Sequence, residues 1–574
     1  MQLKIIVFVV LALALLIVGS SIHQRVTDPQ GRDDWAYNPQ KDFDEGRVYS
    51  APSQALTNTA PMAGMAAEDN LGFSVGGAKD IENFRQNIEN GFLPLPTDIT
   101  YEGLIYSYFF DTGMQQACDV LFCPSYAYAV AKDPLSGEVQ YYLTVGLNSG
   151  LKESDFQRKK LNLVIVLDIS GSMSSSFDRY YYDQFGNAHE VGNIEDQNKT
   201  KLQVATAAIV DLLDRLTADD RLGVVLFDDQ AYLGKGFSMV GDTDMARLKG
   251  HILELQPAGG TNMSAGMQMG TELFKELQGV NPDEYENRII FLTDAMPNTG
   301  ETSEQGLLGM AKRNAQAGIY GTFIGIGVDF NTELIESITK IRGANYYSMH
   351  SAAEFKERMD DGFSYMITPL VFNLRLNLEA AGFEIEKVYG SPEADLATGT
   401  LMQVNTLFPS KTQDGQTKGG VVLLKLKRIG EGAFAHLKLS AVYEDRNGSP
   451  GASEADVTFG DQAPDFYQNL GIRKAVLLAR YSEFLKNWTV DERVSQEKGA
   501  PIEPTMSAES GIVVVQDVQL GQWERQSLPL HVMPAYKEMF QSLQGYFETE
   551  MAQCDDETLK QELELLNTLI AHES

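Results

Sequence analysis

The chain has 574 residues, a formal net charge of −33 at pH 7 and 43% hydrophobic residues. A single hydrophobic core rarely grows beyond about 250–300 residues, so we expect several folded domains. The excess of acidic residues argues against a nucleic-acid-binding protein, because contacts to phosphates need clustered Lys and Arg.

The chain begins with a basic residue and a continuous apolar run. Lys4 precedes the apolar residues 5–18, and small residues follow at 19–21. This order is typical of a signal peptide, although the run through Ile22 is also just long enough for an uncleaved membrane anchor. Both interpretations of residues 1–22 stay open. Both place the bulk of the chain outside the cytoplasm, secreted, periplasmic or anchored by its N-terminus.

Residues 23–80 are rich in Asp, Asn, Gln, Pro and Ser and show no sustained period, which predicts a linker. Residues 81–160 form an N-terminal flank with strand-like runs, the clearest at 140–147. We expect these strands to complete a β module further along the chain. Cys118 and Cys123 are close enough in sequence to form a short disulfide in an exported protein.

Oxygen-bearing side chains follow a buried apolar run at 163–167. Asp168, Ser170 and Ser172 come directly after it, and oxygen ligands of this kind suit Mg²⁺. Two later segments reinforce the pattern: Thr261 lies in a Gly-Gly-Thr-Asn loop before a helix, and Asp294 ends a second apolar strand. Strand ends and loops from distant sequence converge in this way at the edge of an open α/β sheet.

Strands and helices alternate through the same region. Helical spacing occurs at 202–216, 243–255, 264–277, 304–317, 332–341 and 352–359. Strands are expected at 221–228 and 231–240, and the later helices alternate with the last strands. This alternation predicts a doubly wound, mainly parallel sheet with helices on both faces.

The motif and its order resemble the von Willebrand factor type A domain and its metal-ion-dependent adhesion site, over residues 161–360. The resemblance implies a Rossmann-like α/β fold in which Ser170, Ser172 and Thr261 ligate Mg²⁺ directly, with Mn²⁺ or Ca²⁺ as alternatives. It further implies that Asp168 and Asp294 act largely through water. An open coordination position would then accept a Glu or Asp carboxylate from a partner protein.

Beyond this domain, residues 371–378 alternate strictly, and the pattern continues through a predicted β-sandwich module at 361–460. Residues 461–574 are predicted to be helical, mainly at 466–488 and 534–571. The flank at 73–109 resembles bacterial exported A-domain proteins labelled calcium-activated chloride channel-like. Apart from the N-terminal run, no apolar stretch is long enough to cross a membrane, so we do not expect transport.

An insertion at 174–200 separates the second motif serine from the first helix. It contains acidic residues and a cluster of aromatic ones: Phe177, Tyr180, Tyr181, Tyr182 and Phe185. Loops on a rigid scaffold often hold binding residues, and Tyr side chains give contact area at low entropic cost, so we predict a partner-binding loop. A polar spacer without a role is the alternative.

The predicted function is Mg²⁺-dependent protein binding or adhesion outside the cytoplasm, without catalytic residues. No His or Lys accompanies the five motif residues as a general base. An envelope assembly scaffold, with a largely structural metal, is the alternative. A hydrolase is a distant third: residues 72–76 match Gly-x-Ser-x-Gly around Ser74, but no apolar strand precedes them.

Overall fold

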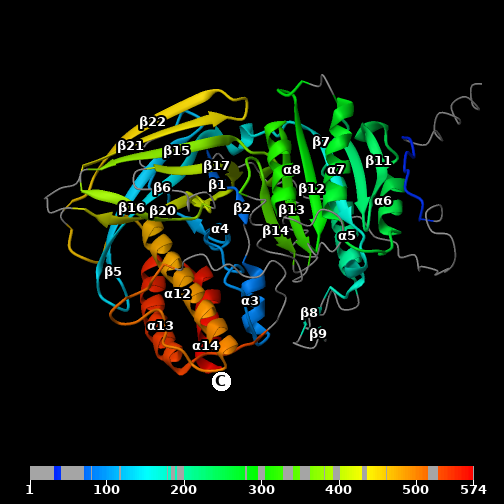
Figure 1. The fold of residues 1–574 in the computed structure, drawn as a ribbon. Coiled ribbons are helices and arrows are strands. Elements are labelled where there is room, and N and C mark those ends of the chain that lie inside the picture. Colours follow the sequence, from blue (N-terminus) through cyan, green and yellow to red (C-terminus); the bar gives the residue numbers. More distant parts are fainter. Residues whose placement is uncertain are drawn as a thin grey trace, which may run out of the picture.

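The computed structural model describes residues 31–39, 70–78, 81–114, 118–177, 179–182, 188–190, 199–277, 281–294, 304–326, 340–349, 362–380, 382–391, 401–429, 436–460, 462–514 and 528–572. A mainly parallel sheet, an antiparallel sheet and a group of helices make up this part of the chain, at the right, upper left and lower left of Figure 1. The predicted signal or anchor at residues 1–22 lies outside the described residues. Within them, no helix is both long and apolar enough to cross a membrane.

The mainly parallel sheet has the strand order β11-β10-β7-β12-β13-β14-β2, and only β11 runs antiparallel to its neighbour. Its strands are β7 (Lys160–Asp168), β10 (Arg221–Phe227), β11 (Ala231–Met239), β12 (Tyr285–Thr293), β13 (Ile319–Ile326), β14 (Asn345–Met349) and β2 (Gly77–Ala78). Central β7 is buried on both faces, which explains its uninterrupted apolar run.

Helices cover both faces of this sheet. On one face, α5 (Lys201–Leu213), α6 (Met245–Leu253) and α11 (Phe363–Ile367) share a core with Leu163 and Ile165. On the other face, α7 (Met263–Leu273) and α8 (Glu304–Gln316) pack with Val164 and Val166. The predicted doubly wound α/β fold is therefore confirmed. The helices predicted at 332–341 and 352–359 lie outside the described residues, except for residues 340 and 341.

The antiparallel sheet takes strands from both sides of the parallel one in sequence. Its order is β16-β20-β6-β1-β17-β15-β21-β22, and β5 pairs with β6 and with β23. The strands are β1 (Asn70–Val75), β5 (Cys123–Lys132), β6 (Val139–Lys152), β15 (Val371–Ala380), β16 (Phe383–Tyr389), β17 (Leu401–Ser410), β20 (Val421–Arg428), β21 (His436–Asp445), β22 (Pro450–Thr458) and β23 (Phe466–Tyr467). The α/β domain is thus inserted between strands of one sheet. Cys123, the first residue of β5, is disulfide-bonded to Cys118.

Two segments depart from the predicted linker at 23–80. Residues 70–78 form β1 and β2, which join the antiparallel and the parallel sheet respectively. Residues 31–39 lie along β11, where Trp35 bridges to Lys235 and its ring stacks on His251 at 5.4 Å. These segments are too short to show a period, and they owe their order to pairing with distant parts of the chain.

The helices α3 (Glu82–Glu89), α4 (Tyr101–Tyr106), α12 (Leu470–Lys498), α13 (Pro534–Cys554) and α14 (Lys560–Ala571) share a third hydrophobic core. The Arg85 guanidinium of α3 pairs with buried Glu562 of α14, which also accepts a hydrogen bond of 2.7 Å from the Tyr108 hydroxyl. The helix predicted at 534–571 is two helices, because Asp555 adopts a left-handed conformation between them.

The two sheets meet at the N-terminal ends of the parallel strands. The Gly343 N–H, before β14, donates to Thr406 Oγ1 at 2.8 Å, and the Arg342 guanidinium lies 4.0 Å from the centre of the Phe372 ring. Arg342 also pairs with Glu444 at 3.0 Å. The carboxyl ends of the parallel strands therefore point away from this interface.

Candidate metal centre

The structure brings the five predicted motif residues to the carboxyl edge of the parallel sheet. Asp168 is the last residue of β7, and Asp294 directly follows the neighbouring β12. The turn after β7 contains Ser170 and Ser172, and the loop before α7 contains Thr261. Four of the five are fully buried, while Ser172 is half-buried. The site is thus built into the edge of the sheet and opens on the side of Ser172.

Backbone hydrogen bonds fix the Thr261 loop against the Asp168 turn. The Gly171 N–H donates to the Gly259 carbonyl at 3.0 Å, and the Ala258 N–H donates to the Ile169 carbonyl at 2.7 Å. Gly259 has a φ of +69°, and a Cβ there would lie 2.7 Å from the Asp229 carboxylate. Glycine is favoured at this position, since a side chain here would strain the left-handed backbone and would force the Asp229 carboxylate to move.

Helix α7 begins directly after Thr261. Asn262 caps it by accepting a hydrogen bond from the Ala265 N–H at 3.1 Å, while its own amide donates to the Asp229 carbonyl. Within the helix, a Cβ at Gly266 or Gly270 would lie 2.7 Å from Phe227 or 2.8 Å from Val166. These glycines let the helix approach the sheet closely, and they thereby set the position of Thr261.

The motif side chains form a partly satisfied hydrogen-bond network. Asp168 accepts hydrogen bonds from the Ser170 N–H at 2.8 Å and from the Thr293 hydroxyl at 2.6 Å. The Ser170 and Ser172 hydroxyl oxygens lie 2.9 Å apart. Asp294 Oδ1 is buried and has no hydrogen-bond partner among the described residues. A buried acceptor in this state is unusual in a folded protein.

Negative charge accumulates at this edge. Burial, together with the nearby Asp294 carboxylate, raises the pKa of Asp168 to about 7, although hydrogen bonds from Ser170 and Thr293 act in the opposite direction. The sequence showed no basic residue beside the motif as a general base, but the structure does bring a buried Lys to it. The Nζ of Lys201, the first residue of α5, lies 3.4 Å from Asp294 Oδ2, and both side chains are buried.

The donor set fits a hard divalent cation. Two carboxylates and three hydroxyls supply oxygen ligands, without nitrogen or sulfur. A cation here would give the Asp294 oxygen a partner, and it would offset the effects of burial and of the Asp294 charge, which raise the pKa of Asp168. Within the described ranges, His, Cys, Asp and Glu form no group of three or more that could hold a metal. The hydroxyls are therefore essential to any metal site at this edge.

The insertion at 174–200 begins and ends next to this centre, between the motif turn and helix α5. Its base is closed by a bridge between Ser176 and Thr200 and by a hydrogen bond of 2.8 Å from the Phe177 N–H to the Lys199 carbonyl. Strands β8 (Arg179–Tyr182) and β9 (Ala188–Glu190) pair antiparallel beyond it, below the parallel sheet in Figure 1. Tyr180, Tyr181 and Tyr182 belong to β8, whereas Phe185 lies outside the described residues.

Phe177 corrects the prediction of a partner-binding aromatic cluster. Its side chain is 2% exposed and belongs to the hydrophobic core under α5, with Met173 and Leu202. It therefore anchors the base of the insertion and is not available to a partner. The sequence could not show whether Phe177, at the start of a polar segment, would be buried in the core or exposed to a partner.

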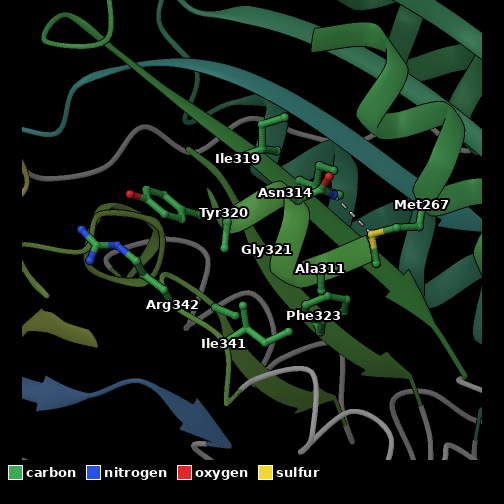
Figure 2. Close-up of a pocket in the computed structure, with 12 residues that line it drawn as sticks. Met267, Ala311, Asn314, Ile319, Tyr320, Gly321, Phe323, Ile341 and Arg342 are labelled. Carbon is green, nitrogen blue, oxygen red and sulfur yellow. Dashed lines mark hydrogen bonds between the residues drawn. The ribbon is translucent and has the colours of Figure 1, made fainter. Parts of the chain in front are cut away.

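Two other candidate sites, a small internal cavity and Ser74, lack the features of a functional site. A cavity of about 20 Å³ lies between α7, α8 and β13, lined by Met267, Ala311, Ile319, Phe323 and Ile341 (Figure 2), and it has room for about one water molecule. Ser74 lies within β1, where it is buried and paired with Phe408 across the sheet. It does not stand at the strand-to-helix turn that a nucleophile elbow requires.

Comparison with known proteins identifies the type of domain. The family model of the von Willebrand factor type A domain matches residues 163–297, which contain all five motif positions. The chain contains a von Willebrand factor type A domain. The A domain, as we call residues 160–367 from here on, includes α11, which completes its core.

The chain is similar to inter-alpha-trypsin inhibitor heavy chains. It is 22% identical to heavy chain H2 of Mus musculus over 224 residues, 38% of this chain and 21% of that protein. With heavy chain H4 of Homo sapiens the identity is 23% over 214 residues, 37% of this chain and 20% of that protein. The chain therefore spans about a fifth of the length of the curated relatives that it matches.

Among solved structures, a von Willebrand factor type A protein from Catenulispora acidiphila matches with a TM-score of 0.40 and 15% identity, over 68% of this chain and 89% of that one. The ArnB paralog VWA2 from Sulfolobus acidocaldarius matches with a TM-score of 0.35 and 12% identity, over 78% and 97%. The likeness of the flanks to calcium-activated chloride channel-like proteins stays a prediction.

Proposed function

We propose that this protein binds a partner protein through a divalent cation held by its A domain, with Mg²⁺ as the first candidate and Mn²⁺ or Ca²⁺ as alternatives. Domains of this type mediate protein–protein interaction and adhesion. The observation that supports the proposal most directly is the unpaired, buried Asp294 oxygen, which stands among two serines, a threonine and a second carboxylate.

Each motif residue has a part in this proposal. Ser170, Ser172 and Thr261 would ligate the cation directly, while Asp168 and Asp294 would hold its water ligands and balance its charge. When bound, the cation supplies an electron-poor centre with a free position for a Glu or Asp carboxylate of the partner. Asp168 is oriented for its part by the Ser170 N–H and the Thr293 hydroxyl.

Binding without turnover is the proposed activity. The only basic side chain that the described residues bring to the motif is Lys201, and it is buried and paired with Asp294. A general base must reach a substrate proton, and an ammonium group in this position does not. An envelope scaffold with a largely structural metal is the second candidate, favoured by the insertion of the A domain between strands of another sheet.

The proposed location is outside the cytoplasm, with residues 1–22 as signal peptide or anchor. The Cys118–Cys123 disulfide supports this, because such bonds persist in oxidising compartments. Protease added to intact cells or spheroplasts should digest the chain. Protection that ends only when the inner membrane is lysed would contradict the proposed location.

Partner capture and thermal stability together test the function. We expect Mg²⁺ to raise the melting temperature of the wild type, because a ligand that binds only the native state stabilises it. Asp168→Ala and Thr261→Ala should abolish this shift and the Mg²⁺-dependent capture of partners from the native envelope. Asp214→Ala, which removes a carboxylate that is 63% exposed from the same domain, is the matched control.

The outcomes separate the two candidates. Capture that EDTA and Asp168→Ala both abolish would support binding through the cation. Capture that persists in Asp168→Ala, although the Mg²⁺-dependent shift is lost, would favour the scaffold. An equal Mg²⁺ shift in the wild type and both site variants would contradict a metal centre at these residues.

A further inference from the structure

Lys201 is buried in a position that two physical effects disfavour. Its side chain is 1% exposed, and transfer of an ammonium group out of water is costly unless negative charge compensates it. It is also the first residue of α5, where the positive end of the helix dipole favours acidic residues. The compensating charge comes from Asp294, whose Oδ2 lies 3.4 Å away.

The backbone around Lys201 fixes the origin of this side chain. The Thr200 hydroxyl accepts a hydrogen bond from the Gln203 N–H at 3.2 Å, and the Gln203 side chain accepts one from the Thr200 N–H at 2.9 Å. The Lys201 N–H donates to the Ser175 carbonyl at 3.0 Å, which ties the helix start to the motif turn. The site therefore contains a positive charge tethered beside one of its own acidic residues.

We propose that the Lys201 ammonium group is an internal competitor of the divalent cation. The inference rests on the proposed metal centre and names a residue that lowers the affinity of this centre for the cation. With both carboxylates ionised, Asp168 and Asp294 supply two negative charges, and Lys201 cancels one of them. The ammonium group and the metal both draw on the charge of Asp294 and repel each other, so the presence of one weakens the binding of the other.

Two consequences follow for the protein. Without metal, Lys201 stabilises the fold by balancing buried negative charge. With metal, the same side chain lowers the affinity, so that occupancy responds to the concentration of the free cation outside the cytoplasm and is not permanent.

Calorimetric titration of the full chain with MgCl₂ tests this inference. Lys201→Met removes the charge and keeps most of the side-chain volume, and we expect it to bind Mg²⁺ at least about tenfold more tightly than the wild type. Lys201→Arg, which keeps the charge, should not gain affinity. Lys275→Met is the matched control, because it removes a Lys that is 71% exposed from the same domain.

Melting curves give a second readout. Lys201→Met should melt below the wild type in EDTA and gain more from Mg²⁺. If it does not fold without metal, it can be purified in MgCl₂, and competition with a chelator of known affinity then gives the same ratio of affinities.

Each result bears on the inference. Equal or weaker Mg²⁺ binding by Lys201→Met would overturn it while leaving the metal centre intact. Binding by Lys201→Met but not by the wild type would support it and contradict Mg²⁺-dependent function of the native protein. Absence of binding in both proteins would overturn both proposals.

Discussion

Asp168 is a carboxyl group whose protonation differs between the folded and the unfolded chain. Its folded pKa is raised to about 7 from an ordinary value of 3.8, mainly by burial and then by Asp294. Between these values the folded state binds more protons, so its stability falls as pH rises through about 7. We predict that the metal-free protein melts at a lower temperature at about pH 8 than at about pH 6. Each pKa unit corresponds to about 1.4 kcal/mol.

The variant Asp168→Asn isolates this effect, since it removes the titration and keeps a similar shape. Asp294, whose charge acts on Asp168, and Lys201, which pairs with Asp294, are unchanged in it. In EDTA, the melting temperature of the variant should change less between about pH 6 and about pH 8 than that of the wild type. In Mg²⁺ the wild type should instead gain stability as Asp168 deprotonates. Parallel pH profiles of wild type and variant in EDTA would refute the assignment.

Gly259 offers a second test at the scale of one residue. Gly259→Ala would place a Cβ 2.7 Å from the Asp229 carboxylate, on a backbone with a φ of +69°. We expect a loss of about 2–4 kcal/mol and a loss of the Mg²⁺-dependent stabilisation, because Thr261 must move with the loop. Gly137→Ala is the control: its φ is +71°, and nothing lies within 4 Å of the added Cβ. It should cost about 1–2 kcal/mol and leave Mg²⁺ binding intact.

The site shows which residues a sequence can reveal. Asp168 and Asp294 are visible because each ends a continuous apolar run, and such runs are a local signal of a buried parallel strand. Lys201 was missed because its partner is 93 positions away. A usable signal existed, since a Lys in the first helical turn opposes the dipole and calls for nearby negative charge.

At the scale of elements, the hairpin β8–β9 can be separated from its anchor. We predict that a short Gly-Ser linker in place of residues 178–196 preserves folding and Mg²⁺ binding and lowers partner affinity at least about tenfold, roughly 1.4 kcal/mol. The replacement keeps Phe177 and the Ser176–Thr200 bridge, which hold the base together. Phe177→Ala should instead cost about 3–5 kcal/mol of stability.

Binding of the captured partner to both proteins, measured by calorimetry, checks the hairpin prediction. Wild-type affinity after the replacement would mean that the hairpin is a spacer. A lost Mg²⁺ shift would mean that the hairpin supports the metal centre itself, contrary to the expectation.

Elements were predictable in proportion to their length. Helices α5 and α7 begin within one residue of the predicted starts, and the apolar runs locate strands β7 and β12 but not their first residues. Strands β1 and β2 and helix α11 did not, because two to six residues contain too little of any period. Their structure is set by partners far along the chain, as when Gly77 pairs with Asn345.

At the scale of the whole molecule, the boundary of the A domain is the clearest difference between sequence and structure. The predicted end at residue 360 leaves out α11, whose Phe363, Met366 and Ile367 are buried in the core beneath α5. The Met366 carbonyl also accepts a hydrogen bond of 2.7 Å from the Asn345 side chain. Each of these apolar side chains contributes about 1.5–3 kcal/mol when fully buried, so the short helix is a large part of the stability of the domain.

We therefore predict that a fragment of residues 157–368 is several kcal/mol more stable than one of residues 157–360. Both retain Arg158, which pairs with buried Asp220 at 2.6 Å, and both lack β2, so they differ only in α11 and the segment that leads to it. Urea denaturation should give the longer fragment the higher midpoint, and Ile367→Asp in that fragment should remove the gain. If the two fragments unfolded at the same urea concentration, α11 would belong to the antiparallel sheet on which it also packs, and the insertion would end before it.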